Sequence, residues 1–122
     1  MSEFKIESIQ AQPEGTRILR LTGPFTLQRV FEFQAVMRTG TDPVTIIDLT
    51  EVPYMDSASL GAIMGAHVLC HKNQRKYALV GVSERLRTLF EVGGVEKLLV
   101  IYPTVEAAQA QFAADKAAGS AA

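Results

Sequence analysis

The sequence predicts an α/β domain built on a mixed β-sheet with helices packed on it. From residue 44 onward, short β-branched apolar segments alternate with longer segments of helical apolar spacing, a pattern typical of parallel strands joined by helical crossovers. The two segments before them are joined by the turn Pro13-Glu14-Gly15, which predicts an antiparallel hairpin. The predicted order is β-β-α-β-α-β-α-β-α, and 122 residues fit a single domain, residues 1–122.

The first three elements follow from alternation and from helix start and stop signals. Alternating apolar residues predict strands over 4–10 and 16–21, the second ended by Gly23-Pro24. Thr26 is the predicted N-cap of a helix that runs to about Arg38 and is stopped by Gly40.

The remaining elements alternate strictly between strand and helix. Nearly all-apolar segments predict strands over 44–49, 77–82 and 98–102. Helices are expected over 57–72, over 84–92 with Ser83 as cap, and after the cap residue Thr104. The core should span about residues 4–112, and the tail 115–122 has nothing to bury and is expected to fray.

Composition and charge limit the classes of function. The formal net charge is −1, so no basic face for direct nucleic-acid binding is indicated. No apolar run approaches the ~20 residues that a membrane span needs, and the N-terminus lacks the pattern of a signal peptide. A single cysteine, Cys70, fits a reducing compartment. We therefore expect a cytoplasmic protein.

Ser57 is the candidate of most interest because it lies at the predicted start of a helix. A hydroxyl there is close to unpaired backbone N–H groups and to the positive end of the helix dipole. A phosphate added to it would interact with both. A serine at this position can equally be a cap or first-turn residue, and Asp56 can itself be the N-cap. The local pattern leaves a modification site and a simple helix start both open.

The helix that follows Ser57 is unusually apolar. Residues 57–70 carry no formal charge, whereas a helix that packs on a sheet usually has a charged outer face. Either neighbouring elements bury this helix on most sides, or one side is a flat surface of small residues available to a partner. The two interpretations are compatible.

No enzyme chemistry is indicated. His67 and His71 are four residues apart with Cys70 between them, but a structural metal site needs about four converging ligands. An apolar helical environment should raise the pKa of the Cys70 thiol, which predicts a core residue rather than a nucleophile. No catalytic Ser/His/Asp arrangement and no glycine-rich phosphate loop is present, so we expect neither an enzyme, nor a metal, nor a cofactor.

The run from Asp48-Leu49-Thr50 to Met55-Asp56-Ser57-Ala58-Ser59-Leu60-Gly61 resembles the signature of the STAS domain, in particular that of bacterial anti-sigma factor antagonists. Three further segments are similar to the same family: Leu21-Thr22-Gly23, the stretch from Ser83 to Gly94, and the stretch from Tyr102 to Ala108. The resemblance spans about residues 4–112 with the order of elements intact. It implies a STAS-like mixed sheet.

The resemblance also implies a binding switch. Ser57 would be the phospho-acceptor, with Asp56 beside it. The unphosphorylated protein would bind an anti-sigma factor that is a serine kinase and so free a sigma factor; phosphorylation would break the complex, and a PPM-type phosphatase would reverse this. The implied partner surface consists of Asp56, Ser57, Ala58, Ser59, Gly61 and Thr26.

Two positions depart from the family pattern. Ala58-Ser59 stands where the family commonly has Ser/Thr-Gly, and the segment ending in Thr26 lacks the acidic residue common after the glycine of the second strand. The alternative function is an unphosphorylated STAS scaffold or regulatory subunit, associated with a transporter or binding a nucleotide.

Overall fold

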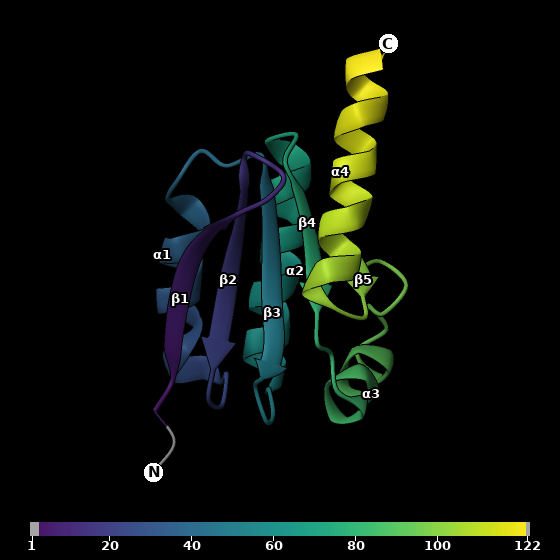
Figure 1. The fold of residues 1–122 in the computed structure, drawn as a ribbon. Coiled ribbons are helices and arrows are strands. Elements are labelled where there is room, and N and C mark those ends of the chain that lie inside the picture. The colour runs from purple at the N-terminus through teal and green to yellow at the C-terminus, as the bar shows by residue number, and fades with distance from the viewer. Residues whose placement is uncertain (1–2, 122) are drawn as a thin grey trace.

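The computed structural model describes residues 3–121 and has the predicted α/β architecture (Figure 1). A five-stranded sheet carries four α-helices and one short 3-10 turn. The elements in chain order are β1 (Lys5–Ala11), β2 (Thr16–Thr22), η1 (Leu27–Arg29), α1 (Val30–Arg38), β3 (Val44–Glu51), α2 (Ser57–Lys72), β4 (Lys76–Val80), α3 (Glu84–Val92), β5 (Ile101–Tyr102) and α4 (Val105–Ala121).

The sheet is mixed, as the sequence predicts. Its strands lie in the order β1-β2-β3-β4-β5, with β1 antiparallel to β2 and all other neighbours parallel. The register places Ile18 beside Ile46, and Ile46 beside Ala78, so that one face of the sheet carries a continuous apolar row. Since β2, β3 and β4 run in the same direction, their carboxyl ends meet at one edge of the sheet.

Helices cover the two faces of the sheet unequally. In Figure 1, α1 and α2 lie behind the sheet, while α4 crosses the front. The larger buried cluster lies on the side of α1, α2 and α3 and includes Leu19, Phe33, Ile47, Leu79 and Phe90. A smaller cluster lies under α4 and consists of Ile18, Ile46, Ala78, Val80, Ala108 and Phe112.

The C-terminal third differs from the sequence expectation in two ways. The last strand is reduced to two residues, because the backbone N–H groups of Leu98 and Leu99 both donate to the Val95 carbonyl and form a turn. The last helix continues to Ala121 instead of fraying from about Asp115. Alanine has the highest helix propensity, and Asp115 forms an ion pair with Lys76 of β4 at 3.4 Å, so this segment has both a preference and an anchor.

Candidate functional site

The candidate site lies where β3 ends and α2 begins. The connector between them runs parallel to the segment that follows β2, because Met55 forms a β-bridge with Phe25. The Phe25 N–H donates to the Tyr54 carbonyl at 3.1 Å. This pairing fixes the start of α2 against the start of η1, so two helix N-termini that are distant in sequence meet at one edge of the sheet.

A reciprocal capping box starts α2. The Ser59 N–H donates to Asp56 Oδ1 at 2.9 Å, and the Asp56 N–H donates to Ser59 Oγ at 3.0 Å. The structure thus confirms Asp56 as the N-cap. Ser59 is completely buried, which corrects its expected place on the partner surface: its hydroxyl belongs to the cap and no partner can touch it.

The second carboxylate oxygen of Asp56 caps a different helix. Asp56 Oδ2 accepts the N–H of Leu27, 29 residues earlier in the chain, at 3.0 Å. Thr26 therefore does not act as the predicted side-chain cap; its hydroxyl bonds to Gln28 Oε1 at 3.2 Å. The first turn is a 3-10 turn and the α-helix begins at Val30 rather than after Thr26.

These hydrogen bonds stabilise the ionised form of Asp56. Burial alone raises the pKa of the Asp56 carboxyl, but the hydrogen bonds from the Ser59 and Leu27 N–H groups and from the Ser59 hydroxyl outweigh it, and the pKa lies below its ordinary value. A negative charge is therefore present beside Ser57 at neutral pH, with both of its oxygens already engaged.

Ser57 is the first residue of α2, and its side chain is exposed. Within the part of the chain that the structure describes, its hydroxyl has no hydrogen-bond partner. Gly61 and Gly65 follow at four-residue intervals on the same exposed side of α2, and a Cβ atom at either glycine would meet nothing within 4 Å. Ala58 is half-buried. Of the residues expected to contact a partner, Ser57 and Gly61 are thus the most accessible.

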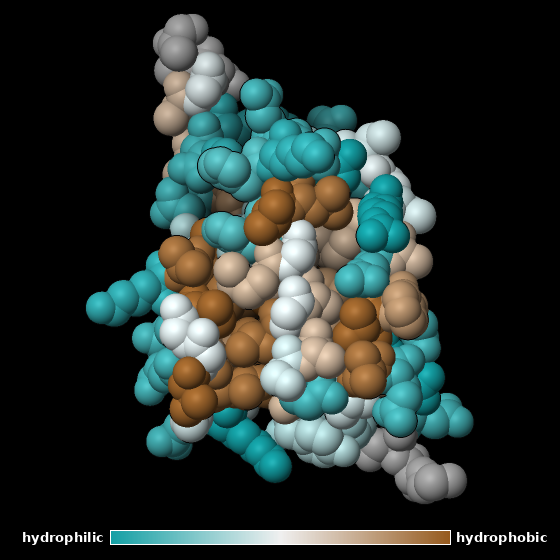
Figure 2. All heavy atoms as spheres, turned by 180° about the vertical axis from the view of Figure 1, so that it is seen from behind, coloured by the Kyte–Doolittle hydropathy of each residue, from teal (hydrophilic) through white to brown (hydrophobic). Residues whose placement is uncertain are grey.

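The face that carries Ser57 also exposes large apolar side chains. Figure 2 shows hydrophobic atoms gathered on the side of α1 and α2, interrupted by a pale strip. Leu27, whose N–H bonds to Asp56, is 61% exposed, and Phe31, one turn later, is 78% exposed. α2 buries Leu60, Ile63 and Cys70 on one side and leaves Gly61 and Gly65 exposed on the other, so the expected surface of small residues is present, and its use by a partner stays a prediction.

One cation at this edge had no signal in the sequence. The Arg85 guanidinium of α3 lies 5.3 Å from the centre of the Tyr54 ring, a cation–π contact. Tyr54 lies in the connector three residues before Ser57. The contact joins residues 31 positions apart, so neither local spacing nor composition could indicate it.

The far end of α2 is structural. His67 Nδ1 and the Tyr77 hydroxyl are 2.7 Å apart, and their rings meet edge to face. Cys70 is buried in the larger core cluster and burial raises the pKa of its thiol, which confirms the predicted core role. Residues 3–121 contain no group of three or more side chains that could hold a metal, and none of the helices described is both long and apolar enough to cross a membrane.

The sequence profile of the STAS domain matches residues 9–108. The chain belongs to the STAS domain family. Its relatives include an anti-sigma-B factor antagonist from Listeria monocytogenes, which is 39% identical over 77 residues, 63% of this chain and 68% of the relative. The expected resemblance to bacterial anti-sigma factor antagonists is therefore confirmed.

Several solved structures share the fold. SpoIIAA in its unphosphorylated form superposes with a TM-score of 0.69 at 20% identity over 96% of this chain and 97% of SpoIIAA. Bacillus SpoIIAA in its phosphorylated form gives 0.67 at 21% identity over 90% and 99%. A sulfate transporter family protein from Wolinella succinogenes gives 0.72 at 25% identity over 84% of this chain and 92% of that protein.

Proposed function

We propose that this STAS domain is an anti-sigma factor antagonist, a binding protein rather than an enzyme, and that phosphorylation of Ser57 switches its binding. The observation that carries the proposal is an exposed serine hydroxyl at the N-terminus of α2, beside an aspartate whose two carboxylate oxygens are both engaged. The Listeria relative is named an anti-sigma-B factor antagonist, and the fold neighbour SpoIIAA has been solved in a phosphorylated form, which supports the same role here.

The proposed cycle has three protein partners. Unphosphorylated, the domain binds an anti-sigma factor that is itself a serine kinase, and so frees a sigma factor. Phosphate transfer from ATP to Ser57 releases the anti-sigma factor, and a PPM-type phosphatase restores the binding form. All these steps belong in the cytoplasm, where transcription is regulated.

Electrostatics alone can drive such a switch. A phosphoserine adds about −1.5 to −2 charges, next to the charge already held by Asp56. The N-terminus of α2 offsets only ~1 kcal/mol of this, whereas burying an unpaired charge against a partner costs several kcal/mol, on the order of the ~5.5 kcal/mol that reverses a 99:1 preference. The switch needs no rearrangement of the domain, provided that the partner covers Ser57.

The acceptor assignment is tested with two neighbouring serines. The domain is incubated with ATP, Mg²⁺ and a kinase-type anti-sigma factor, beginning with the anti-sigma-B factor of Listeria monocytogenes, and its intact mass is measured. Wild type and Ser59→Ala should each gain one phosphate, and Ser57→Ala none. Phosphate on Ser57→Ala would overturn the assignment.

The charge mechanism is tested by affinity. Ser57→Asp should bind the same anti-sigma factor at least about tenfold more weakly than wild type, whereas Ser57→Ala should bind within about threefold. Equal affinities for wild type and Ser57→Asp would contradict a charge switch even if Ser57 accepts phosphate.

A second candidate is a scaffold or regulatory subunit that is not phosphorylated. The Wolinella sulfate transporter family protein supports it, since its fold is as similar to this chain as that of the antagonist SpoIIAA. The neighbouring genes separate the two: a kinase-like anti-sigma factor favours the switch, and a transporter operon favours the scaffold. Titration with ATP or GTP in a calorimeter tests the further possibility of a nucleotide-binding module.

A further inference from the structure

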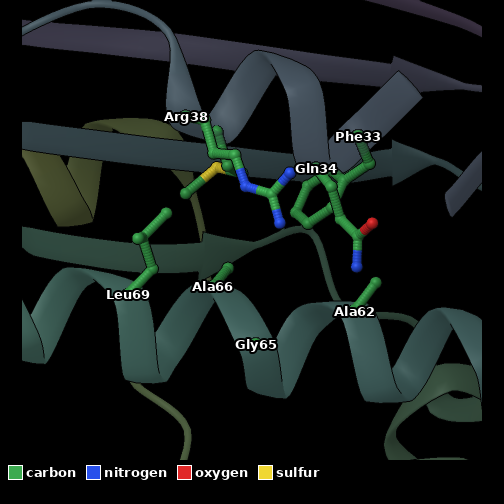
Figure 3. Close-up of a pocket in the computed structure, with 8 residues that line it drawn as sticks. Phe33, Gln34, Arg38, Ala62, Gly65, Ala66 and Leu69 are labelled. Atoms are coloured by element: carbon green, nitrogen blue, oxygen red, sulfur yellow. The ribbon is translucent and has the colours of Figure 1, made fainter. Parts of the chain in front are cut away.

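A groove separates α1 from α2 on the same face of the molecule as Ser57. Figure 3 shows Gln34 and Arg38 reaching from α1 toward α2, while Ala62, Ala66 and Leu69 point from α2 toward α1. Phe33 and Met37 complete the floor, and both are buried. Apart from Gln34 and Arg38 the lining is apolar.

The size of the groove selects its occupant. Its volume is about 120 Å³, whereas pockets that bind small molecules are usually about 300–1,000 Å³. A cavity of roughly 150 Å³ accommodates a single benzene ring. The groove therefore fits one branched or aromatic side chain, which points to a protein partner rather than to a metabolite.

Arg38 places a positive charge at the mouth of the groove. Arg38 is exposed at the C-terminal end of α1. Within residues 3–121 its guanidinium has no ion-pair or hydrogen-bond partner. By contrast, Arg29 and Arg87 both pair with glutamates, at 3.0 and 3.5 Å. An unpaired guanidinium at the mouth of an apolar groove is complementary to a carboxylate placed near an apolar side chain.

The groove is continuous with the surface around Ser57. Gly65 lines the groove and lies on the exposed side of α2 that also carries Gly61 and Ser57. Eight residues of helix place Gly65 about 12 Å from Ser57. A glycine inside a helix costs about 1 kcal/mol relative to alanine, and no neighbouring atom requires Gly65 to be small. The open backbone there lets a partner helix approach closely.

We propose that a helix of the anti-sigma factor docks along α2, inserts one apolar side chain into the α1–α2 groove, and pairs a carboxylate one turn away with Arg38. This inference rests on the proposed function, since it names the part of the anti-sigma factor that binds the surface of this domain beyond Ser57. The apolar side chain supplies affinity, and the carboxylate fixes the orientation of the helix relative to Ser57.

Filling the groove tests the apolar contact. Gly65→Leu places a branched side chain over the groove and should weaken binding of the anti-sigma factor at least about tenfold. Gly119→Leu is the matched control: it makes the same change at an exposed glycine of α4, where a Cβ atom would also meet nothing within 4 Å, and it should bind within about threefold of wild type. Circular dichroism of Gly65→Leu verifies that the domain is folded.

Reversing the charge tests the ion pair. Arg38→Glu should weaken binding about tenfold or more, and Lys116→Glu on α4, a similar change of charge on the opposite face of the sheet, should leave binding nearly unchanged. Changing the responsible Asp or Glu of the anti-sigma factor to Arg should restore binding to Arg38→Glu. Wild-type affinity should also fall with salt more steeply than that of Arg38→Gln.

The outcomes separate this inference from the proposed function. If Ser57→Asp weakens binding while Gly65→Leu and Arg38→Glu bind like wild type, the groove is not the docking site and the phosphorylation switch stands. If wild type binds no kinase-type anti-sigma factor, the proposed function and the docking proposal are both wrong. Self-association of the domain in sedimentation that Gly65→Leu abolishes would assign the groove to a second copy and overturn the proposal.

Discussion

At the scale of single residues, Asp56 does more than its place in the sequence indicates. One carboxylate oxygen starts α2 through Ser59, and the other holds the first turn after β2 through the Leu27 N–H. The starts of α2 and η1 at the Ser57 edge therefore both depend on one side chain. Substituting it should alter the shape of the candidate partner surface as well as its charge.

The two functions of Asp56 can be separated by substitution. Asp56→Asn keeps one acceptor oxygen for the α2 cap but replaces the other with an NH₂ group that cannot accept the Leu27 N–H. We expect a loss of about 1 kcal/mol of unfolding free energy for Asp56→Asn and about 2 kcal/mol for Asp56→Ala, measured by urea denaturation at pH 7. No loss in Asp56→Asn would show that the bond to Leu27 contributes nothing, and equal losses in the two variants would show the same for the cap bond from Ser59.

The same carboxylate predicts an acid dependence of stability. Hydrogen bonds hold the folded-state pKa of Asp56 below its ordinary value, so the group stays ionised to lower pH in the folded than in the unfolded chain. Its contribution is complete above the unfolded pKa of about 4 and is lost as the pH falls through the lower folded value. The stability gap between wild type and Asp56→Asn should be constant from pH 7 to about pH 5 and narrow below pH 4. A gap that widens on acidification would contradict this.

At the scale of elements, two glycines with a left-handed backbone differ in how closely another segment packs against them. Gly81, directly after β4, has φ +69°, and a Cβ atom there would lie 2.8 Å from the Thr50 backbone nitrogen. Gly94, after α3, has a similar φ of +72° but open space around it. The pair thus separates backbone strain from steric overlap.

We predict that Gly94→Ala costs about 1 kcal/mol, from the left-handed backbone alone. Gly81→Ala should cost about 3 kcal/mol, because the end of β3 at Thr50 must shift as well. Chemical denaturation of both variants measures the difference. Similar losses of unfolding free energy in the two variants would mean that the backbone at Thr50 moves aside without a loss of stability.

The sequence predicted elements well where the cause was local. Alternation gave β1 and β2, apolar runs gave β3 and β4, and Ser83 was recognised as a cap that accepts the Leu86 N–H. It failed where a partner came from elsewhere in the chain. Asp56, not Thr26, satisfies the first turn after β2, and α4 continues past the expected end of the core, where Asp115 pairs with Lys76 of β4.

The candidate site shows the same division. Ser57 and Asp56 could be found from their position at a helix start, because the capping pattern lies within four residues. The burial of Ser59, the contact of Arg85 with Tyr54 and the α1–α2 groove depend on how α1, α2 and α3 pack against each other. No residue spacing within one element encodes that packing, so the sequence could not give the shape of the partner surface.

At the scale of the whole molecule, the two faces of the sheet differ in how they are covered. One helix, α4, closes the smaller core cluster, and Phe112 provides its large aromatic side chain. Phe112→Ala should therefore cost about 3–5 kcal/mol. Phe31→Ala, which removes the same side chain from an exposed site, should change stability by less than about 0.5 kcal/mol. Thermal unfolding of the two variants tests whether α4 is an integral part of the fold.

The position of Ser57 at one edge of the sheet also determines which parts of the domain a phosphate on Ser57 can affect. The Ser57 edge lies at the carboxyl ends of the strands, and charge effects between exposed groups are largely screened beyond about 8 Å at physiological salt. We predict that phosphorylation shifts amide resonances at the start of α2 and, through the bond from Leu27 to Asp56, in η1. Resonances of α4 and of the groove near Arg38, about 12 Å along α2 and beyond, should stay in place. Two-dimensional ¹H–¹⁵N spectra of the two forms measure this. Shifts spread over the sheet and α4 would mean that the switch works by rearranging the domain, and that the partner is released by a change of shape instead of by charge at the contact.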